Sequence, residues 1–208
     1  DPFTGYAVGN NGNIIKSITP FGLWGTIYDQ AQTATINDGI IYLIEYDTAA
    51  TQLNFVDSFI LGGANGDYFF YGHPAGNYLI LARPDESIYP NSIPTYFGNT
   101  AFWGYAQVIN LISDTSGIDI RVREIPTWTG NGFCSGTIRF GLGSGKTGNG
   151  NAVPFGDPVP GIDVALEQVP GGIIKAHTTT NDTGFFSFSN IPMNTSYKLL
   201  VDIPGLPM

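Results

Sequence analysis

The stretch Gly66-Asp67-Tyr68-Phe69-Phe70 returns later in the chain as Gly184-Phe185-Phe186-Ser187-Phe188. In both stretches aromatic residues alternate along the chain, so Tyr68 and Phe70 should share one face of a strand, as should Phe186 and Phe188. An Asn-Gly or Asp-Thr-Gly combination opens each stretch and supplies the glycine that a tight hairpin needs. The two stretches therefore predict the same strand in two copies of one β unit.

The similarity extends outward on both sides of this strand. Upstream, Leu23-Trp24-Gly25-Thr26-Ile27 recurs as Cys134-Ser135-Gly136-Thr137-Ile138, and residues 38–45 recur as 160–167. Downstream, a proline and then a tyrosine open an apolar strand in each copy, namely Pro74 and Tyr78 in the first and Pro192 and Tyr197 in the second. Three blocks in one order indicate an internal duplication. Short strands at this spacing, with turn residues between them, predict a β-sandwich.

We therefore predict an all-β chain with two tandem immunoglobulin-like sandwiches of seven strands each. The predicted parts are a leading hairpin, linker or end of a preceding domain over 1–21, a first module over 22–125, a linker over 126–132 and a second module over 133–208. Further strands of the first module are expected near 107–112 and 117–124. The second module stops before its matching C-terminal strands, so we expect the natural polypeptide to continue and an edge that is exposed or covered by a partner.

Composition excludes several classes of function. Among 208 residues there are 8 Lys plus Arg and 17 Asp plus Glu, giving a net charge of −9. Such an acidic chain argues against nucleic acid, which is bound through Lys and Arg contacts to phosphate, and against anionic membranes. No apolar run is long enough for membrane insertion. A single cysteine excludes an intrachain disulfide. With few charged residues, the chain is typical of an extracellular or cell-surface bacterial protein.

The repeated pattern resembles the carboxypeptidase-regulatory-like, transthyretin-like and Cna-B-type β-sandwich modules, over about 22–125 and 133–208. The segment Pro94-Thr95-Tyr96-Phe97-Gly98, followed by Trp103, is similar to modules of large secreted surface proteins of Bacteroidetes that use type IX secretion. Cna-B-type relatives often carry a Lys–Asn isopeptide bond. Tyr28 and Arg139 stand where that lysine would lie, so the resemblance implies no crosslink here.

Two motifs with catalytic associations are better explained as turns. The segment 141–147, Gly-Leu-Gly-Ser-Gly-Lys-Thr, lacks the first glycine of a phosphate-binding loop, because Phe140 stands there, and no helix-forming residues follow it. We interpret it as a loop. Asp182-Thr183-Gly184 matches the aspartic-protease tripeptide, but that chemistry needs two such carboxylates. We expect no enzyme activity and no catalytic residue.

Two kinds of ligand site remain as candidates. Calcium takes oxygen ligands from loops, and Asn65, Asp67, Asn181 and Asp182 lie at predicted turn tips. No other cofactor is expected. Aromatic side chains could stack on a glycan, and Tyr96 and Trp103 belong to an aromatic cluster in the long connection of the first module. The alternative is that this cluster plugs one end of the sandwich. Trp128, in the predicted linker, is expected to be exposed or to pack between modules.

The sequence thus predicts a non-catalytic structural or stalk segment of a large secreted or cell-surface bacterial protein, which spaces or assembles other domains. Its expected partners are neighbouring modules of the same polypeptide, other surface proteins or glycans. The alternatives are an adhesin or carbohydrate-binding accessory module, and an accessory region of a secreted hydrolase.

Overall fold

The computed structural model describes residues 4–8, 14–18, 20–49, 52–63, 65–141 and 155–203. Its contacts divide the chain into a first unit, residues 1–124, and a second unit, residues 125–208. Strands dominate both units, and the helical element of the described residues is one short 3-10 turn, η1 (Trp103–Tyr105). In that part of the chain, no helix has the length and apolar character needed to cross a membrane.

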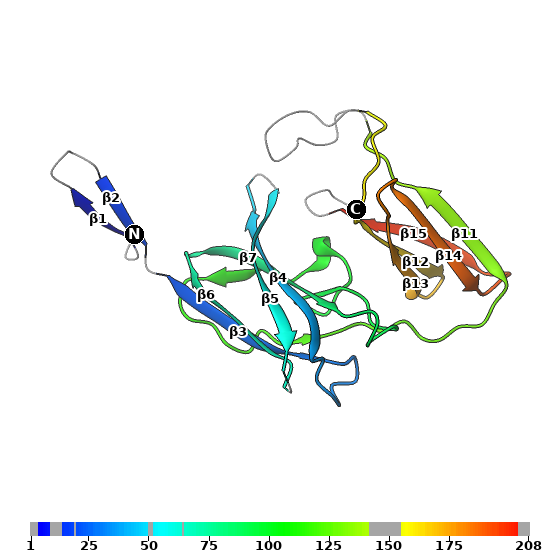
Figure 1. The fold of residues 1–208 in the computed structure, drawn as a ribbon, viewed down its shortest axis with the longest axis horizontal. Coiled ribbons are helices and arrows are strands. Elements are labelled where there is room, and N and C mark those ends of the chain that lie inside the picture. The colour runs from blue at the N-terminus through cyan, green and yellow to red at the C-terminus, as the bar shows by residue number, and fades with distance from the viewer. Residues whose placement is uncertain are drawn as a thin grey trace. The chain divides into compact units, whose positions relative to one another are not determined.

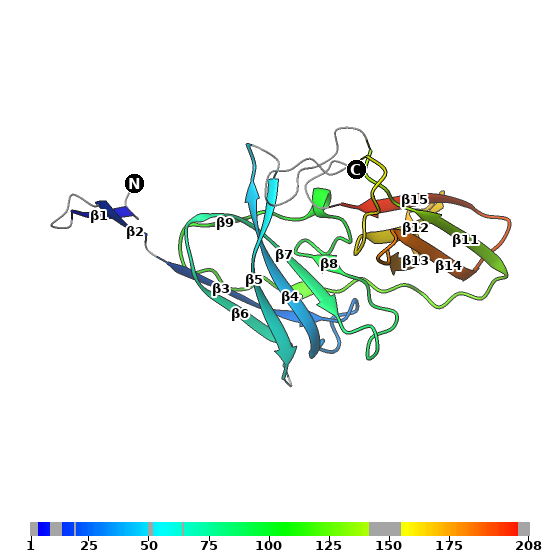
Figure 2. The ribbon, with the colours of Figure 1, turned by 45° about the horizontal axis from the view of Figure 1, so that its top comes forward.

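The first unit contains a hairpin and a two-layer sandwich. The hairpin consists of β1 (Thr4–Val8) and β2 (Ile14–Ile18), which pair antiparallel. One layer of the sandwich has the order β10-β3-β6, and the other has the order β5-β4-β7-β8, with β9 also on β7. Figures 1 and 2 show β3 beside β6 in one layer and β4, β5 and β7 in the other. The strands are β3 (Phe21–Tyr28), β4 (Asp38–Asp47), β5 (Gln52–Gly62), β6 (Asp67–His73), β7 (Gly76–Pro84), β8 (Thr95–Tyr96), β9 (Ile109–Leu111) and β10 (Ile120–Arg121).

Inward-facing residues of both layers form the core of this sandwich. The side chains of Tyr68 and Phe70 are 1% and 2% exposed, which confirms that the alternating aromatics of β6 face the interior. The Tyr68 hydroxyl donates to the carbonyl oxygen of Ile118 at 2.6 Å, and burial raises the pKa of Tyr68 far above its ordinary value. Ile118, Ile120 and Val122 are also buried, as their alternation with charged residues predicts. Other core members are Leu23, Ile27, Ile41, Leu43, Ile80, Ala82 and Leu111.

The five-stranded layer is also covered on its outer face. Strand β7 buries five consecutive residues, Tyr78 to Ala82, because alternate side chains point to opposite faces and both faces are packed. A second cluster lies on the outer face, where the long connection after β7 folds back over the sheet. Its members are Ile44, Leu79, Leu81, Tyr96 and Trp103.

The second unit is a smaller sandwich of the same kind. Strand β11 (Gly132–Thr137) pairs with β14 (Phe185–Ile191). Strand β12 (Asp163–Val169) lies between β13 (Ile173–Thr179) and β15 (Ser196–Asp202). The core between these two sheets contains Val164, Leu166, Phe186, Phe188 and Ile191.

The duplication holds at the level of strand register. Gly25 on β3 lies opposite Tyr68 on β6, and the equivalent Gly136 on β11 lies opposite Phe186 on β14. Backbone hydrogen bonds repeat as well. The N–H of Ile27 donates to the carbonyl of Gly66 at 2.9 Å, and that of Ile138 donates to Gly184 at 2.8 Å.

The turn before the last shared strand is fixed in the same way in each unit. The hydroxyl of Tyr78 donates to the carbonyl of Pro74 at 2.9 Å, and that of Tyr197 donates to Pro192 at 2.7 Å. The repeated glycines, prolines and tyrosines of the sequence are therefore residues that hold one scaffold.

The all-β sandwich prediction is confirmed, with three differences of detail. The tight hairpins predicted at Gly66 and Gly184 are wrong, because the strands on either side of each turn belong to different sheets. Strand β5 pairs with β4 and β6 with β3, while β13 pairs with β12 and β14 with β11. Within the described residues, the first sandwich has eight strands, β3 to β10, since the short β8 joins the edge of β7. The strands predicted over 107–112 and 117–124 are shorter, namely β9 and β10.

Candidate functional site

The two aromatic residues predicted to contact a ligand in the first unit are buried. Tyr96 is 1% exposed and Trp103 is 6% exposed. The Trp103 ring meets the Tyr46 ring edge-on, with centroids 6.2 Å apart, in the cluster on the outer face of the five-stranded layer. Buried rings offer no face to a sugar. The structure thus supports the alternative in which these side chains close the sandwich.

Trp128 packs within the second unit. The Nζ of Lys175, on β13, lies 2.9 Å from the centroid of the Trp128 ring, which is a cation–π contact. Lys175 is buried, and desolvation lowers the pKa of its ammonium group. Trp128 Nε1 is buried and has no hydrogen-bond partner among the described residues. This ring is half-buried and covered by Lys175, so it does not form an open platform.

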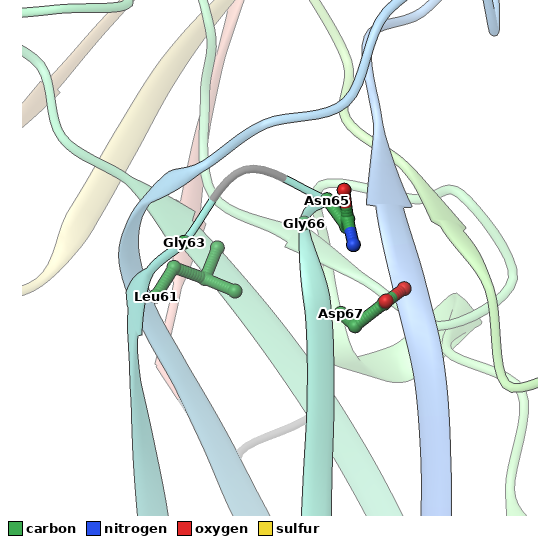
Figure 3. Close-up of a pocket in the computed structure, with 5 residues that line it drawn as sticks. All are labelled: Leu61, Gly63, Asn65, Gly66 and Asp67. Atoms are coloured by element: carbon green, nitrogen blue, oxygen red, sulfur yellow. The ribbon is translucent and has the colours of Figure 1, made fainter.

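Asn65 and Asp67, two of the predicted calcium ligands, line a small pocket between the end of β5 and the start of β6 (Figure 3). The Asp67 carboxylate points toward β3, and its Oδ1 accepts a hydrogen bond from the Thr26 hydroxyl at 2.7 Å. Calcium takes six to eight oxygens. Two side chains supply few of these, and calcium binding here stays a prediction.

At the second predicted calcium site, Asn181 has a structural role. Its Oδ1 accepts hydrogen bonds from the backbone N–H of Thr183 and of Phe185, each at 3.0 Å, and from the Thr183 hydroxyl at 2.8 Å. These bonds fix the turn that Asp182 belongs to. The described residues contain no group of three or more Asp, Glu, His or Cys side chains placed to hold a metal ion.

The remaining residues with a possible chemical role lie in strands, in loops or outside the described residues. Most of the loop 141–147 lies outside the described residues. Each histidine pairs with an aspartate: His73 Nε2 lies 3.0 Å from Asp57 Oδ2, and His177 Nε2 lies 3.1 Å from Asp163 Oδ1. Arg139, at the position that the resemblance assigns to an isopeptide lysine, donates to the Gly156 carbonyl at 2.8 Å. Tyr28 is the last residue of β3.

A different set of aromatic residues forms an exposed surface on the first unit. We call Trp24, Phe69 and Tyr71 the aromatic surface. They lie on the outer face of β3 and β6, and they are 37%, 49% and 66% exposed. The Trp24 and Tyr71 centroids are 6.5 Å apart, and those of Phe69 and Tyr71 are 5.2 Å apart. Phe59, on β5, is partly buried next to this surface, with its centroid 4.9 Å from that of Phe69.

Local sequence explains how these rings come together. Residues 68–71 are all aromatic, and two of them point inward, so Phe69 and Tyr71 must point outward. Trp24 pairs with Phe69 across the strands. Gly22 is buried beneath the Tyr71 ring, since a Cβ at this position would lie 2.7 Å from Tyr71 Cδ1. The same alternation that places Tyr68 and Phe70 in the core places Phe69 and Tyr71 on the outer face. The sequence-based prediction missed this second consequence.

The second unit lacks this surface, although its strands have the same register. The pair Ser135 and Ser187 stands where the first unit has Trp24 and Phe69. Ser189 stands in place of Tyr71, and all three serines are exposed. The residue matching Gly22 is Phe133, which is 67% exposed, and Phe185, which is 41% exposed, stands in place of Asp67. The shared scaffold therefore does not require the three outward aromatics.

Carboxylates lie next to the aromatic surface. Asp114 Oδ1 accepts the N–H of Gly22 at 2.8 Å, and Asp119 Oδ1 accepts the N–H of Thr26 at 2.9 Å. An ionised carboxylate has about four acceptor positions, so each keeps the capacity to accept ligand hydroxyl groups. The site thus combines flat apolar ring faces with hydrogen-bond acceptors at their border.

Comparison with known proteins gave few matches to the sequence. No family model matches this chain. Colossin-A of Dictyostelium discoideum is 28% identical over 141 residues, which cover 62% of this chain and 1% of Colossin-A. The matched stretch is thus a very small part of that protein.

Three solved structures are similar in part. The TIE protein of Bacillus anthracis is 12% identical with a TM-score of 0.35, covering 97% of this chain and 34% of that chain. A streptococcal ancillary pilin is 12% identical with a TM-score of 0.34, covering 90% and 55%. A DUF3823 family protein from Bacteroides uniformis is 13% identical with a TM-score of 0.35, covering 87% and 96%. Similarities at these TM-scores do not assign a function.

Proposed function

We propose that this chain is a non-catalytic structural segment of a larger secreted or cell-surface protein, in which its sandwich modules space or assemble other domains. The observation that carries the proposal is the repeated register. Gly25 faces Tyr68 as Gly136 faces Phe186, and the Gly66 and Gly184 carbonyls accept equivalent bonds. The chain uses the same scaffold twice, and the repeated residues hold its strands and turns. This arrangement is what we expect of a spacer.

The polar groups that suggested chemistry are used in the same structural way. Asn181 caps a turn with three accepted hydrogen bonds, and Asp67 accepts from Thr26 across two strands. The low content of charged residues favours an extracellular location, and the absence of an intrachain disulfide fits a bacterial surface protein better than an animal secreted one. The proposed partners are neighbouring modules of the same polypeptide.

An exchange experiment tests the spacer function. In the full-length protein, residues 22–208 would be replaced by two unrelated β-sandwich domains of equal total length. The surface function of the parent protein should survive this exchange and should be weakened by deletion of the same residues. Antibodies against residues 22–124 should label intact cells. Loss of function upon exchange, as complete as upon deletion, would contradict a spacer role and indicate that these modules act through their own surface.

A further inference from the structure

A spacer does not explain the aromatic surface. Three large rings stand exposed on one sheet face, although removing apolar area from water is favourable. The second unit folds with Ser135, Ser187 and Ser189 at the matching positions. The rings are therefore an addition to the scaffold of the first unit, and contiguous exposed apolar surface of this kind marks interaction sites.

The rings are in continuous contact. Centroids follow one another from Phe59 to Phe69 at 4.9 Å, from Phe69 to Tyr71 at 5.2 Å and from Tyr71 to Trp24 at 6.5 Å. Trp24 lies across the strands from Phe69, and Tyr71 lies two residues further along β6, so the three exposed rings form a compact cluster over both strands. Tyr71 is tilted by about 40° from each of its neighbours Trp24 and Phe69, so the cluster offers ring faces at different tilts.

The charges around the aromatic surface favour a neutral ligand. Asp67, Asp114 and Asp119 border the three rings through their bonds to Gly22 and Thr26, whereas β10 carries one guanidinium, Arg121. An acidic border in a chain of net charge −9 would repel nucleic acid or an acidic polysaccharide. The carboxylates accept hydrogen bonds, and a polysaccharide offers many hydroxyl donors.

The position on a sheet face disfavours an extended peptide. Added strands bind through unpaired N–H and C=O groups at a sheet edge. Strand β3 is paired on both sides, with β6 and with the segment that contains β10, whereas β6 is the outer strand of this layer. A strand added to β6 would lie beside the rings in the plane of the sheet and would not cover them. What the face offers is ring surface, and the C–H groups on one side of a pyranose are attracted to the negative face of an aromatic ring.

We propose that the aromatic surface of the first unit, formed by Trp24, Phe69 and Tyr71, binds a neutral polysaccharide. The rings stack on its pyranose units, and the carboxylates of Asp114 and Asp119 accept hydrogen bonds from its hydroxyl groups at the border. This site differs from the buried Tyr96 and Trp103 that the sequence suggested.

Binding to defined polysaccharides tests the proposal with the whole 208-residue chain. Affinity electrophoresis would survey soluble β-glucan, xylan, mannan and, as an anionic probe, polygalacturonate. Calorimetry with the matching oligosaccharides would then give dissociation constants. The wild-type chain should bind at least one neutral polysaccharide, and the triple variant Trp24→Ser, Phe69→Ser, Tyr71→Ser should bind it at least about tenfold more weakly. This variant places in the first unit the residues that the second unit already holds.

Phe133→Ser is the matched control, since it removes an exposed ring from the equivalent face of the second unit. It should leave the affinity unchanged. Urea unfolding of each variant would establish that it is folded. The proposal would be overturned if no neutral polysaccharide bound, if the folded triple variant bound as well as wild type, or if polygalacturonate were preferred. It would also be overturned if the triple variant altered only self-association in sedimentation experiments, because the surface would then join copies of this chain.

Discussion

The ring of Tyr71 lies over Gly22, so closely that a Cβ on Gly22 would come within 2.7 Å of Tyr71 Cδ1 and 2.9 Å of Cε1. The aromatic surface thus depends on a residue without a side chain as much as on its three rings. Tyr71 is 66% exposed, which leaves its ring room to move outward.

We expect Gly22→Ala to displace the Tyr71 ring at little cost in stability. Alanine reduces the entropy of the unfolded chain, which favours folding by about 0.4–1 kcal/mol where the backbone permits it, and this gain offsets the lost ring contacts. The free energy of unfolding in urea should change by less than about 1 kcal/mol. The near-ultraviolet circular dichroism of the Trp24–Tyr71 pair should change clearly. Gly63→Ala, where a Cβ meets no atom within 4 Å, is the control. A large loss of stability would show that Tyr71 is fixed in place.

Gly66→Ala should be strongly destabilising. Gly66 has φ of +67°, and a Cβ there would lie 2.7 Å from the Ile27 carbonyl oxygen and 2.9 Å from that of Ile36. Gly72 has φ of +85°, and a Cβ there would meet no atom within 4 Å, so Gly72→Ala carries the backbone strain alone. We expect about 1 kcal/mol for Gly72→Ala and at least about 2 kcal/mol more for Gly66→Ala, measured by urea unfolding. Equal losses of stability in the two variants would mean that the close contacts with the Ile27 and Ile36 carbonyl oxygens are easily relieved.

The internal repeat made the scaffold predictable from sequence. Alternation placed Tyr68 and Phe70 in the core, and the repeated Pro74 and Tyr78 marked a turn that both units share. At Gly66 the local sequence could not distinguish a hairpin from a connection between two sheets. A positive φ is needed both in a tight hairpin and in a chain that crosses between two sheets, so the residue type does not distinguish the two.

The site could not be located from composition alone. Tyr96 and Trp103 are aromatic residues in a long connection, and whether such a segment is exposed depends on what it covers. The outward apolar residues Leu79 and Leu81 of β7 are what it covers here. The consecutive apolar residues 78–82 of β7 gave a signal for this in the sequence, because a strand that is apolar at successive positions is packed on both faces.

Removing the hydroxyl of Tyr78 should destabilise the first unit more than the equivalent change destabilises the second. Tyr78 is 1% exposed, and its hydroxyl donates to Pro74 at 2.9 Å, whereas Tyr197 is only half-buried. We expect Tyr78→Phe to cost about 1–2 kcal/mol and Tyr197→Phe about 0.5–1 kcal/mol in urea unfolding. Tyr105→Phe, on a side chain that is 74% exposed, should cost nothing measurable. Equal costs for all three variants would remove the turn hydrogen bond as their cause.

Stability in acid should depend on the turn after β3. The Thr33 hydroxyl donates to Asp29 Oδ2, and the Thr33 N–H donates to Oδ1, each at 2.7 Å. The hydroxyl bond is the largest cause of a lowered pKa for Asp29 in the folded chain. Because this pKa lies below its unfolded value of about 3.9, the ionised carboxylate stabilises the fold above that pH. The contribution is lost as the pH falls through the lowered folded pKa.

Thr33→Ala should therefore raise the pKa of Asp29 toward its ordinary value, as followed by NMR titration of the carboxyl carbon. The variant should be less stable than wild type at pH 7, and the difference between them should shrink as the pH falls through the lowered folded pKa of Asp29. In an Asp29→Asn background the pH dependence of the Thr33→Ala effect should disappear, because no carboxylate remains to titrate. A difference that is the same at pH 7 and in acid would show that Thr33 acts through the shape of the turn and not through the charge of Asp29.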